Sequence, residues 1–592
     1  MRYLANGSIR VPEDTADLVV MLEWIDRQHT LALDTETTGL DIYSDDHRIR
    51  LIALATPNEA WVFPAERMWS SAFRVTERLR GKRLIMHNAP YDIPVLARHG
   101  LADIERMFAQ TRDTKNMAHQ VDPRGRDEGG IGQSLDELVK HYMPEYSKLG
   151  DDLKDEFKRL KDRGVIPKST PMSMMWVVMP LDNEVYNVYA GTDAMLTARL
   201  FKILKKKIDV NSELTQADNK TAMIASLMDA KGFLLDREYT TELRNTLLRD
   251  EQKWKNRAYE HGLENINSPQ QVAEALERIG LVPKEKTPKG NPKVDKVFLG
   301  QHTDVPLVQA IVEGKKAGKW RTTWVEKFLG AADSAGRVHP STNTLRARTA
   351  RFSITGIPAQ TLPSSDSVVR SCFVADTGEI IVGVDYAQQE LRLTAAYAKD
   401  PRMIKAFKNG EDLHYITAET AWPGRGMEMR KYGKGGNFGT VYGAKERALM
   451  DQFNMTYDQA RKVIQAIRKA YPGIQRLSDA LADEATRYGY ITTDYGRKLP
   501  VDDHRLYAAL NYKIQSTGRD VTAQAMHRLY DAGYVDYMRL AIHDELLFSL
   551  PQGEPELVVE IERIMSTSVG RVEIPAEAKI GGRAWGSLYP GG

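Results

Sequence analysis

Residues 430–443, RKYGKGGNFGTVYG, constrain the fold more than any other segment of this chain, because they place chemical groups at a helical spacing. Two cations and two aromatic residues follow one another at steps of four: Arg430, Lys434, Phe438 and Tyr442. Residues four apart share one face of a helix, and this face would bind a nucleotide from its phosphates to its base. The five glycines argue for the alternative, a flexible phosphate-cradling or linker loop, since each glycine costs an exposed helix about 1 kcal/mol.

The composition is that of a globular protein with several domains, since 592 residues can form more than one core. The 82 basic and 80 acidic residues leave a net charge of only +2, so a polyanion must bind to local basic patches. Cys372 is the single cysteine, which excludes an intrachain disulfide and cysteine-built metal sites and fits a reducing cytoplasm. No run of eighteen apolar residues occurs, so no signal peptide or membrane span is predicted.

The first 205 residues are predicted to form an α/β domain. Apolar runs between residues 31 and 63 predict three strands, and the run at 84–86 predicts a further strand that leads into a helix. Residues 134–143 predict a helix behind a serine cap. A basic run from Lys202 to Lys207 marks the end of this domain.

The remainder of the chain alternates between helical and strand-like sequence. Charged helical stretches extend from the first domain to about residue 280. Residues 284–296 are rich in lysine, proline and glycine and predict an exposed loop, which is either solvated or in contact with a DNA backbone. From about residue 340 onward, strand-like runs are interrupted by a largely helical block near 401–487.

Acidic residues in the first domain come from three segments. Asp34 and Glu36 stand two apart on a predicted strand, so both carboxylates point to one face. Asp92 follows the strand at 84–86, while Tyr189 and Asp193 stand four apart on a predicted helix. Considered without the other segments, Asp34 and Glu36 would be solvated acids at the end of a strand. Four acids together, however, can hold two metal ions that hydrolyse a phosphodiester. Tyr189 would help to position the attacking water.

A second acidic set lies in the C-terminal half. The strand EIIVGV ends at Asp385, and Glu390 follows it. MRLAIHDELLFSL predicts two strands joined by a tight turn at His543 and Asp544, with Glu545 beginning the second strand. Asp385 and Asp544 would then meet across neighbouring strands and supply the carboxylates that Mg²⁺ needs beside substrate phosphates. A solvated turn is the alternative.

At this point the chain resembles the family A DNA polymerases, the DNA polymerase I family. DYAQQELR is similar to the family's first motif, residues 430–443 to its fingers-helix motif R-x3-K-x3-F-G-x2-Y-G, and IHDE to its third. Five further segments match in order: NSPQQ, KTPKG, TARFS, EDLHYITA and NYKIQ. NAPYD and YAGTD resemble two motifs of the family's proofreading exonuclease. The resemblance covers nearly the whole chain.

The resemblance implies an α/β and α+β multidomain protein, in which a ribonuclease H-like exonuclease domain precedes a right-hand polymerase. The expected domains are the exonuclease at 1–205, a mainly helical thumb at 206–338, the first part of the palm at 339–400, the fingers at 401–487 and the second part of the palm at 488–592. Because no 5′ nuclease precedes the exonuclease, the chain resembles compact bacteriophage replicative polymerases.

The resemblance also implies roles for the C-terminal residues. Asp385 and Asp544 would bind two Mg²⁺ ions, with Glu545 in support, to activate the primer 3′-hydroxyl and hold the triphosphate. Nucleotide contacts are implied for six residues, with Arg430, Lys434 and His414 at the phosphates, Phe438 over the nucleotide, Tyr442 near the templating base and Glu390 as the steric gate that excludes a ribose 2′-hydroxyl.

The same resemblance assigns the exonuclease metals and the DNA contacts. Asp34, Glu36, Asp92 and Asp193 would hold two divalent ions, Mg²⁺ or Mn²⁺, beside Tyr189. Arg351, Gln360, Asn511 and Gln515 would contact primer and template. Tyr507 departs from the family pattern, because bacterial enzymes usually carry an arginine there that contacts the primer terminus.

The implied partners are primer–template DNA and deoxynucleoside triphosphates, with a helicase, a primase and a single-strand binding protein as further candidates. No insertion of the kind that docks a processivity factor is evident in the thumb, no membrane partner is expected, and the implied location is the cytoplasm of the bacterial host.

Two other functions remain open on the sequence. A single-subunit RNA polymerase shares the order of acids and fingers helix, although Glu390 and the exonuclease acids weigh against it. A DNA-binding scaffold with only nuclease activity would not need Asp385, Lys434 and Asp544.

Overall fold

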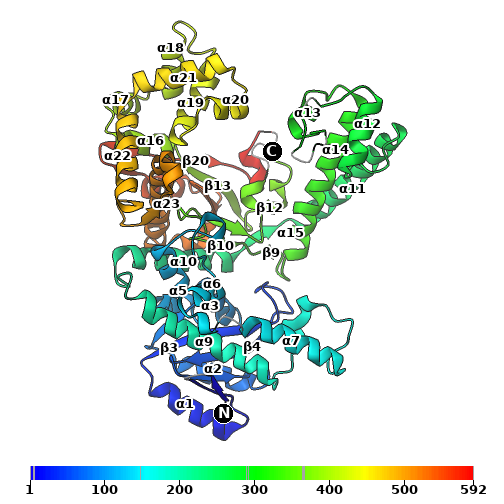
Figure 1. Cartoon of the computed structure of the whole chain (residues 1–592), viewed down its shortest axis with the longest axis vertical. Helices are drawn as coiled ribbons and strands as arrows, with labels where there is room; N and C mark the ends of the chain where they lie inside the picture. The colour runs from blue at the N-terminus through cyan, green and yellow to red at the C-terminus, as the bar shows by residue number, and fades with distance from the viewer. Residues whose placement is uncertain are drawn as a thin grey trace.

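The computed structural model describes residues 2–4, 7–146, 149–283, 285–287, 290, 292–362 and 367–590. In Figure 1 the residues up to about 205 form the lower part of the molecule. A group of helices between residues 237 and 320 extends on the right, and the helical block that follows residue 401 stands at the top. No helix within the described ranges is both long enough and apolar enough to cross a membrane.

A seven-stranded mixed sheet organises the N-terminal part, in the order β1-β2-β5-β4-β3-β6-β7. Its strands are β1 (Arg2–Leu4), β2 (Gly7–Arg10), β3 (Thr30–Thr37), β4 (Ile49–Ala55), β5 (Glu59–Phe63), β6 (Arg83–Met86) and β7 (Thr111–Asp113). Successive residues of β4 enter different cores, Ile52 and Leu54 on one face and Leu51 and Ala53 on the other, as a strand buried on both faces requires. The four strands predicted between residues 31 and 86 are confirmed, whereas the short β1 and β2 were not predicted.

Helices cover both faces of this sheet. They are α1 (Thr15–Asp26), α2 (Trp69–Glu77), α3 (Ala89–Arg98), α4 (Ile104–Gln110), α5 (Thr114–Val121), α6 (Leu135–Tyr142), α7 (Leu149–Asp162), α8 (Met175–Val178) and α9 (Glu184–Leu204). The predicted serine cap is confirmed, because Ser134 and Glu137 form a capping box at the start of α6. α9 packs across β3, β4 and β5.

The middle of the chain is mainly helical, as predicted. Its helices are α10 (Glu213–Lys231), α11 (Arg237–Glu260), α12 (Pro269–Arg278), α13 (Lys296–Gly300), α14 (Pro306–Trp320) and α15 (Glu326–Ala331). α11 and α14 pack along each other. In the lysine-rich loop before α13, Lys293 is paired with Glu285 and Asp295 at 2.7 and 3.3 Å. Lys284 and Lys289 of the same prediction lie outside the described residues.

A four-stranded antiparallel sheet lies at the centre of the C-terminal half, in the order β16-β17-β13-β20. Its strands are β13 (Glu379–Tyr386), β16 (Met538–Ile542), β17 (Glu545–Pro551) and β20 (Ala576–Ile580), and the two strands predicted from MRLAI and ELLFSL are therefore confirmed. Three helices accompany it: α16 (Gln389–Ala398), α23 (Ala509–Asp531) and α24 (Pro555–Met565). β13 continues one residue beyond its predicted end at Asp385.

The helical block between these strands is confirmed. Its helices are α17 (Pro401–Lys408), α18 (Leu413–Ala421), α19 (Arg430–Val441), α20 (Glu446–Phe453), α21 (Tyr457–Ala470) and α22 (Pro472–Tyr488). The remaining strands pair as short two- or three-stranded sheets: β8 (Phe233–Leu235), β9 (Arg337–Val338), β10 (Ser341–Asn343), β11 (Ser353–Thr355), β12 (Phe373–Val374), β14 (Tyr490–Thr492), β15 (Lys498–Pro500), β18 (Thr567–Val569) and β19 (Val572–Ile574).

Candidate active sites

A first carboxylate cluster forms where β3, α3 and α9 meet, and it unites Asp34 and Glu36 with Asp92 and Asp193. Thr35 fixes Asp92, since its backbone N–H and its hydroxyl donate to one carboxylate oxygen at 3.0 and 2.6 Å. Burial, and then repulsion by Asp92, raises the pKa of Asp34. Burial and repulsion by Asp193 raise the pKa of Glu36 in the same way. The acids of the three sequence segments are thus close enough to raise one another's pKa within one site.

The other two acids and Tyr189 complete this cluster. Burial raises the pKa of Asp92 to about 7 and that of Asp193 to about 7. Tyr189 lies one turn before Asp193 on α9 and is hydrogen-bonded to it. The charge of Asp193, together with burial, raises the pKa of the Tyr189 phenol, so this hydroxyl keeps its proton and can act as a donor.

The chemistry of this cluster suits a hard divalent cation. All four acids offer oxygen ligands, and their mutual repulsion is the force that a bound cation would relieve. Among the described residues, no three His, Cys, Asp or Glu side chains already stand together as a complete ligand set for a metal. The four carboxylates are therefore the type of ligand that such a cation binds. The protein alone does not arrange them in a complete coordination geometry.

The second cluster lies on the four-stranded sheet. Asp385 on β13 is paired in register with Glu545 on β17, and Asp544 directly precedes Glu545. Burial, and after it the Asp385 charge, raises the pKa of Glu545 to about 7 and the pKa of Asp544 above its usual range. His543 makes the tight turn with a φ of 60°, in the left-handed region. The predicted meeting of Asp385 and Asp544 on neighbouring strands is therefore found.

Two residues that sequence reasoning missed shape this second cluster. A Cβ atom at Gly383 would lie 2.5 Å from Oε1 of Glu545, so glycine at this position makes room for the carboxylate. Lys579 on β20 donates from Nζ to Asp385 Oδ2 at 3.2 Å and balances its charge. Strand pairing brings Lys579 close across 194 residues, and no local signal indicates it.

The segment 430–443 is a helix, α19, up to Val441, and the exposed Tyr442 is the residue that caps its C-terminal end. Arg430 is ion-paired with Asp412, which lies just before α18. Lys434 is exposed and makes no hydrogen bond or ion pair with a described residue. The two cations thus differ: one is already engaged, and the other is free to meet a phosphate.

The glycines of α19 decide between the two structures that the sequence left open. A flexible phosphate-cradling or linker loop was the alternative to a helix, and the segment is helical up to Val441. Four of the glycines are buried against the neighbouring helices: Gly433, Gly435, Gly436 and Gly439. Added Cβ atoms would lie 2.2 Å from the His414 carbonyl oxygen at Gly433 and 1.9 Å from a Val463 methyl at Gly436. The glycines allow close helix packing, because interiors leave no space for an extra methyl group.

His414 lies beneath the same helix. Its side chain is buried, Asn437 Nδ2 lies 3.1 Å from its Nδ1, and its ring centroid is 5.7 Å from that of Phe438. Burial lowers the pKa of His414 to about 4 even though Asp412 opposes the shift, so the ring is neutral at pH 7. Any phosphate contact from His414 would therefore be a neutral hydrogen bond.

Glu390 is hydrogen-bonded to two other predicted site residues. Arg351 donates to Glu390 Oε1 at 2.6 Å, and the Tyr442 hydroxyl donates to Oε2 at 3.0 Å. Arg351 and Glu390 line a small cavity together with Gln515 and Asp544. The end of α19, the start of α16 and the segment that carries Arg351 are thus linked around one carboxylate.

Of the four predicted DNA contacts, Arg351 and Gln515 line this cavity. Gln360 donates from Nε2 to the Phe352 carbonyl at 2.8 Å, which braces the segment that carries Arg351. Gln515 accepts a bond of 3.4 Å from the Thr349 hydroxyl. Nδ2 of Asn511 is buried and has no hydrogen-bond partner among the described residues. This donor is therefore unused within the described part of the protein.

Tyr507 is 51% exposed and lies against the end of α19, where a Cβ atom at Gly443 would be 2.9 Å from its ring. This contact explains an aromatic residue at the position, since a tyrosine ring covers the turn after the helix.

Together, the two sites define an enzyme class. One site places acids and a tyrosine on a mixed sheet, and the other sets acids on an antiparallel sheet beside a helix that presents cations and aromatic rings. These are the parts of a nucleotide-polymerising enzyme that carries a nuclease. Residues 237–587 match the family described as "DNA polymerase family A", and residues 9–209 match "3'-5' exonuclease". The chain belongs to DNA polymerase family A and is a DNA-directed DNA polymerase with a 3′–5′ exonuclease domain.

Two similar proteins are bacteriophage enzymes. A DNA polymerase of Mycobacterium phage L5 is 41% identical over 602 residues, which are 100% of this chain and 99% of the relative. One of Mycobacterium phage D29 is 41% identical over 606 residues, with the same coverage of 100% and 99%. A solved structure, the "POL domain of Pol1 from M. smegmatis complex with DNA primer-template and dNTP", shares the fold with a TM-score of 0.75 and 21% identity, covering 98% of this chain and 100% of that one.

Polymerase and exonuclease domains of these families generally use divalent metal ions.

Proposed function

We propose that the enzyme copies primer–template DNA from deoxynucleoside triphosphates with Asp385 and Asp544 as ligands of two Mg²⁺ ions. The register that sets Asp385 opposite Glu545, beside Asp544, carries this proposal. When bound, the ions supply positive charge at the attacking and leaving oxygens. Glu545, which is paired in register with Asp385, supports the site as a neighbouring carboxylate.

The nucleotide contacts are inferred from the exposure of each side chain and from the partners it already has. Lys434 is exposed and unpaired, so it meets the triphosphate directly, and Arg430 joins it by exchanging Asp412 for a phosphate. Phe438 offers its ring to the nucleotide, and Tyr442 reaches the templating side while its hydroxyl holds Glu390. Glu390, fixed from two sides, excludes a ribose 2′-hydroxyl.

DNA contacts are assigned to Arg351 and Gln515, which line the same cavity, and to Gln360 and Asn511. The domains proposed are the exonuclease at 1–205, the thumb at 206–338, the palm at 339–400 and 488–592, and the fingers at 401–487.

Proofreading is assigned to the first cluster. Asp34, Glu36, Asp92 and Asp193 would hold two divalent ions, Mg²⁺ or Mn²⁺. Tyr189, protonated beside Asp193, would orient the attacking water.

Separation of the two activities tests these assignments. On a labelled primer–template, Asp544→Ala should abolish extension and leave 3′–5′ degradation, whereas Asp34→Ala should abolish degradation and leave extension, because the two carboxylate sets belong to separate sheets. Glu560→Ala, at a partly exposed acid of α24, serves as the control that changes neither. Extension by the Asp544 variant, or degradation by the Asp34 variant, would show that the corresponding site is misplaced.

The relatives suggest the biological setting. Because two relatives that match over their full length are phage DNA polymerases, we infer that this enzyme replicates a bacteriophage genome in the cytoplasm of a bacterial host. A helicase, a primase and a single-strand binding protein would be its partners. Association of these proteins with the purified polymerase, measured by light scattering on a primed fork, tests this inference.

A further inference from the structure

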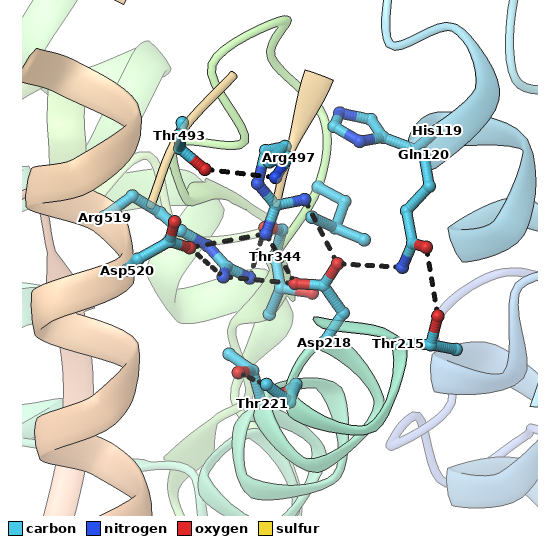
Figure 2. Close-up of polar contacts among 12 residues, drawn as sticks. His119, Gln120, Thr215, Asp218, Thr221, Thr344, Thr493, Arg497, Arg519 and Asp520 are labelled. Carbon is cyan, nitrogen blue, oxygen red and sulfur yellow. Dashed lines mark hydrogen bonds and ion pairs between the residues drawn. The ribbon is translucent and has the colours of Figure 1, made fainter. Parts of the chain in front are cut away.

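Four charged side chains form a buried network between the two catalytic parts of the molecule (Figure 2). Arg497 donates to both oxygens of Asp218 at 3.1 and 2.8 Å. Arg519 lies 3.2 Å from Asp218 Oδ1 and donates to Asp520 Oδ1 at 2.9 Å. The four side chains are between 0% and 4% exposed, and their two positive and two negative charges cancel. Such a network is balanced only while every member keeps its place.

A buried ion network contributes little net stability but restricts geometry, because each displaced charge would lose its partners in a medium that does not solvate it. Burial alone would raise the pKa of Asp218, yet Arg497 and Arg519 lower it to about 2, so the carboxylate is charged at neutral pH. The guanidinium of Arg519 is therefore held in one orientation.

One arm of the network reaches the exonuclease domain. Gln120 on α5 donates from Nε2 to Asp218 Oδ2 at 3.3 Å and accepts a bond of 3.0 Å from the Thr215 hydroxyl. Figure 2 shows Gln120 entering the network from the helix opposite α10. Asp218 is thus held by Gln120 on one side and by Arg497 and Arg519 on the other.

The other arm reaches the polymerase cavity. Arg519 donates from Nη2 to the Thr344 carbonyl at 3.3 Å, and its guanidinium lies 5.1 Å from the centre of the Phe352 ring. Phe352 directly follows Arg351, which holds Glu390 at 2.6 Å. Arg519 also lines the same cavity as Glu390.

We propose that Arg519 is a positioning residue for sugar selection: fixed by Asp218 and Asp520, it packs on Phe352 and so holds Arg351 and Glu390 in place. This proposal rests on the sugar-selecting role proposed above for Glu390. Lysine cannot replace the arginine, because an ammonium group lacks the planar fork that serves two carboxylates, a carbonyl and a ring together.

The test compares kcat/KM for a deoxynucleotide with kcat/KM for the matching ribonucleotide. Arg519→Lys should lower this discrimination about tenfold, mainly through a higher kcat/KM for the ribonucleotide, because a displaced Glu390 no longer excludes the 2′-hydroxyl. A tenfold change corresponds to the loss of about one hydrogen bond. Phe352→Leu should lower the discrimination similarly, and the double variant should be no worse than either, since both act through one contact.

Arg528→Lys is the matched control. Arg528 lies on the same helix and donates to the carbonyls of Ile564 and Met565 at 2.8 and 3.0 Å, away from Glu390. It should lose stability without losing discrimination, and hydrolysis of single-stranded DNA verifies that each variant is folded. Discrimination unchanged in both Arg519→Lys and Phe352→Leu, while Glu390→Ala relaxes it, would overturn the positioning role alone. Discrimination unchanged in Glu390→Ala would overturn both the sugar-selecting role and this proposal.

Discussion

Four glycines of α19 lie where neighbouring helices leave no room for a side chain. The sequence placed them in a nucleotide-binding segment and suggested contact with ligands, whereas the structure uses them to pack α19 onto α18, α20 and α21. Their cost in helix propensity is offset by this close packing. At the residue scale, therefore, spacing predicted the helix that carries Arg430, Lys434 and Phe438, but not why the intervening positions are small.

Gly436→Ala should destabilise the enzyme by about 1 to 3 kcal/mol and raise the KM for deoxynucleotides, because the new methyl group overlaps Val463 and displaces α19. Urea unfolding followed by circular dichroism and steady-state extension measure the two effects. Gly330→Ala in α15 is the control, since no atom lies within 4 Å of its added Cβ. A Gly436 variant as stable as Gly330→Ala would contradict the packing described.

At the scale of elements, side chains distant in the sequence fix how strands and helices join. Asp229 at the end of α10 accepts bonds of 2.7 and 2.8 Å from the backbone and hydroxyl of Thr342 on β10. Burial raises the pKa of Asp229 from 3.8 to about 7 despite these bonds. The folded protein therefore holds a proton here that the unfolded chain releases.

Asp229 gives stability a definite pH dependence. An acid whose pKa is raised by folding binds more protons in the native state, so stability falls as the pH rises from about 4 to about 7. Asp229→Asn should remove this part of the dependence, because an amide does not titrate. Unfolding midpoints in urea at pH 5 and pH 8 would measure it, and an equal loss of stability in both proteins would mean that Asp229 is ionised throughout.

At the scale of the molecule, the buried network of Asp218, Arg497, Arg519 and Asp520 joins the exonuclease part to the polymerase part, because Gln120 of α5 donates to Asp218. Tyr43 adds a second junction, stacking on His339 with ring centroids 3.7 Å apart. These contacts join segments that are hundreds of residues apart in the sequence. The exonuclease and polymerase parts are therefore connected by side-chain contacts as well as by the chain that links them.

Asp218→Asn should lower the stability of the enzyme by about 3 to 5 kcal/mol, because it leaves two buried arginines with one carboxylate. Thermal unfolding and retention of both activities after heating would show the loss. Glu428→Gln breaks the exposed pair with Arg425 and should change nothing measurable. Equal stability of the two variants would show that solvent reaches the network.

The sequence by itself determined the chemistry of this protein. Hydrophobic alternation placed the strands, a serine cap placed α6, and acids at strand ends with cations at helical spacing indicated both sites, because these signals are local. Tertiary structure decided what depends on distant partners: Lys579 beside Asp385, Glu390 held by Arg351 and Tyr442, and Arg519 balanced by Asp218. Such contacts produce no periodic pattern in the sequence, because they form only when the folded chain brings remote segments within hydrogen-bond distance.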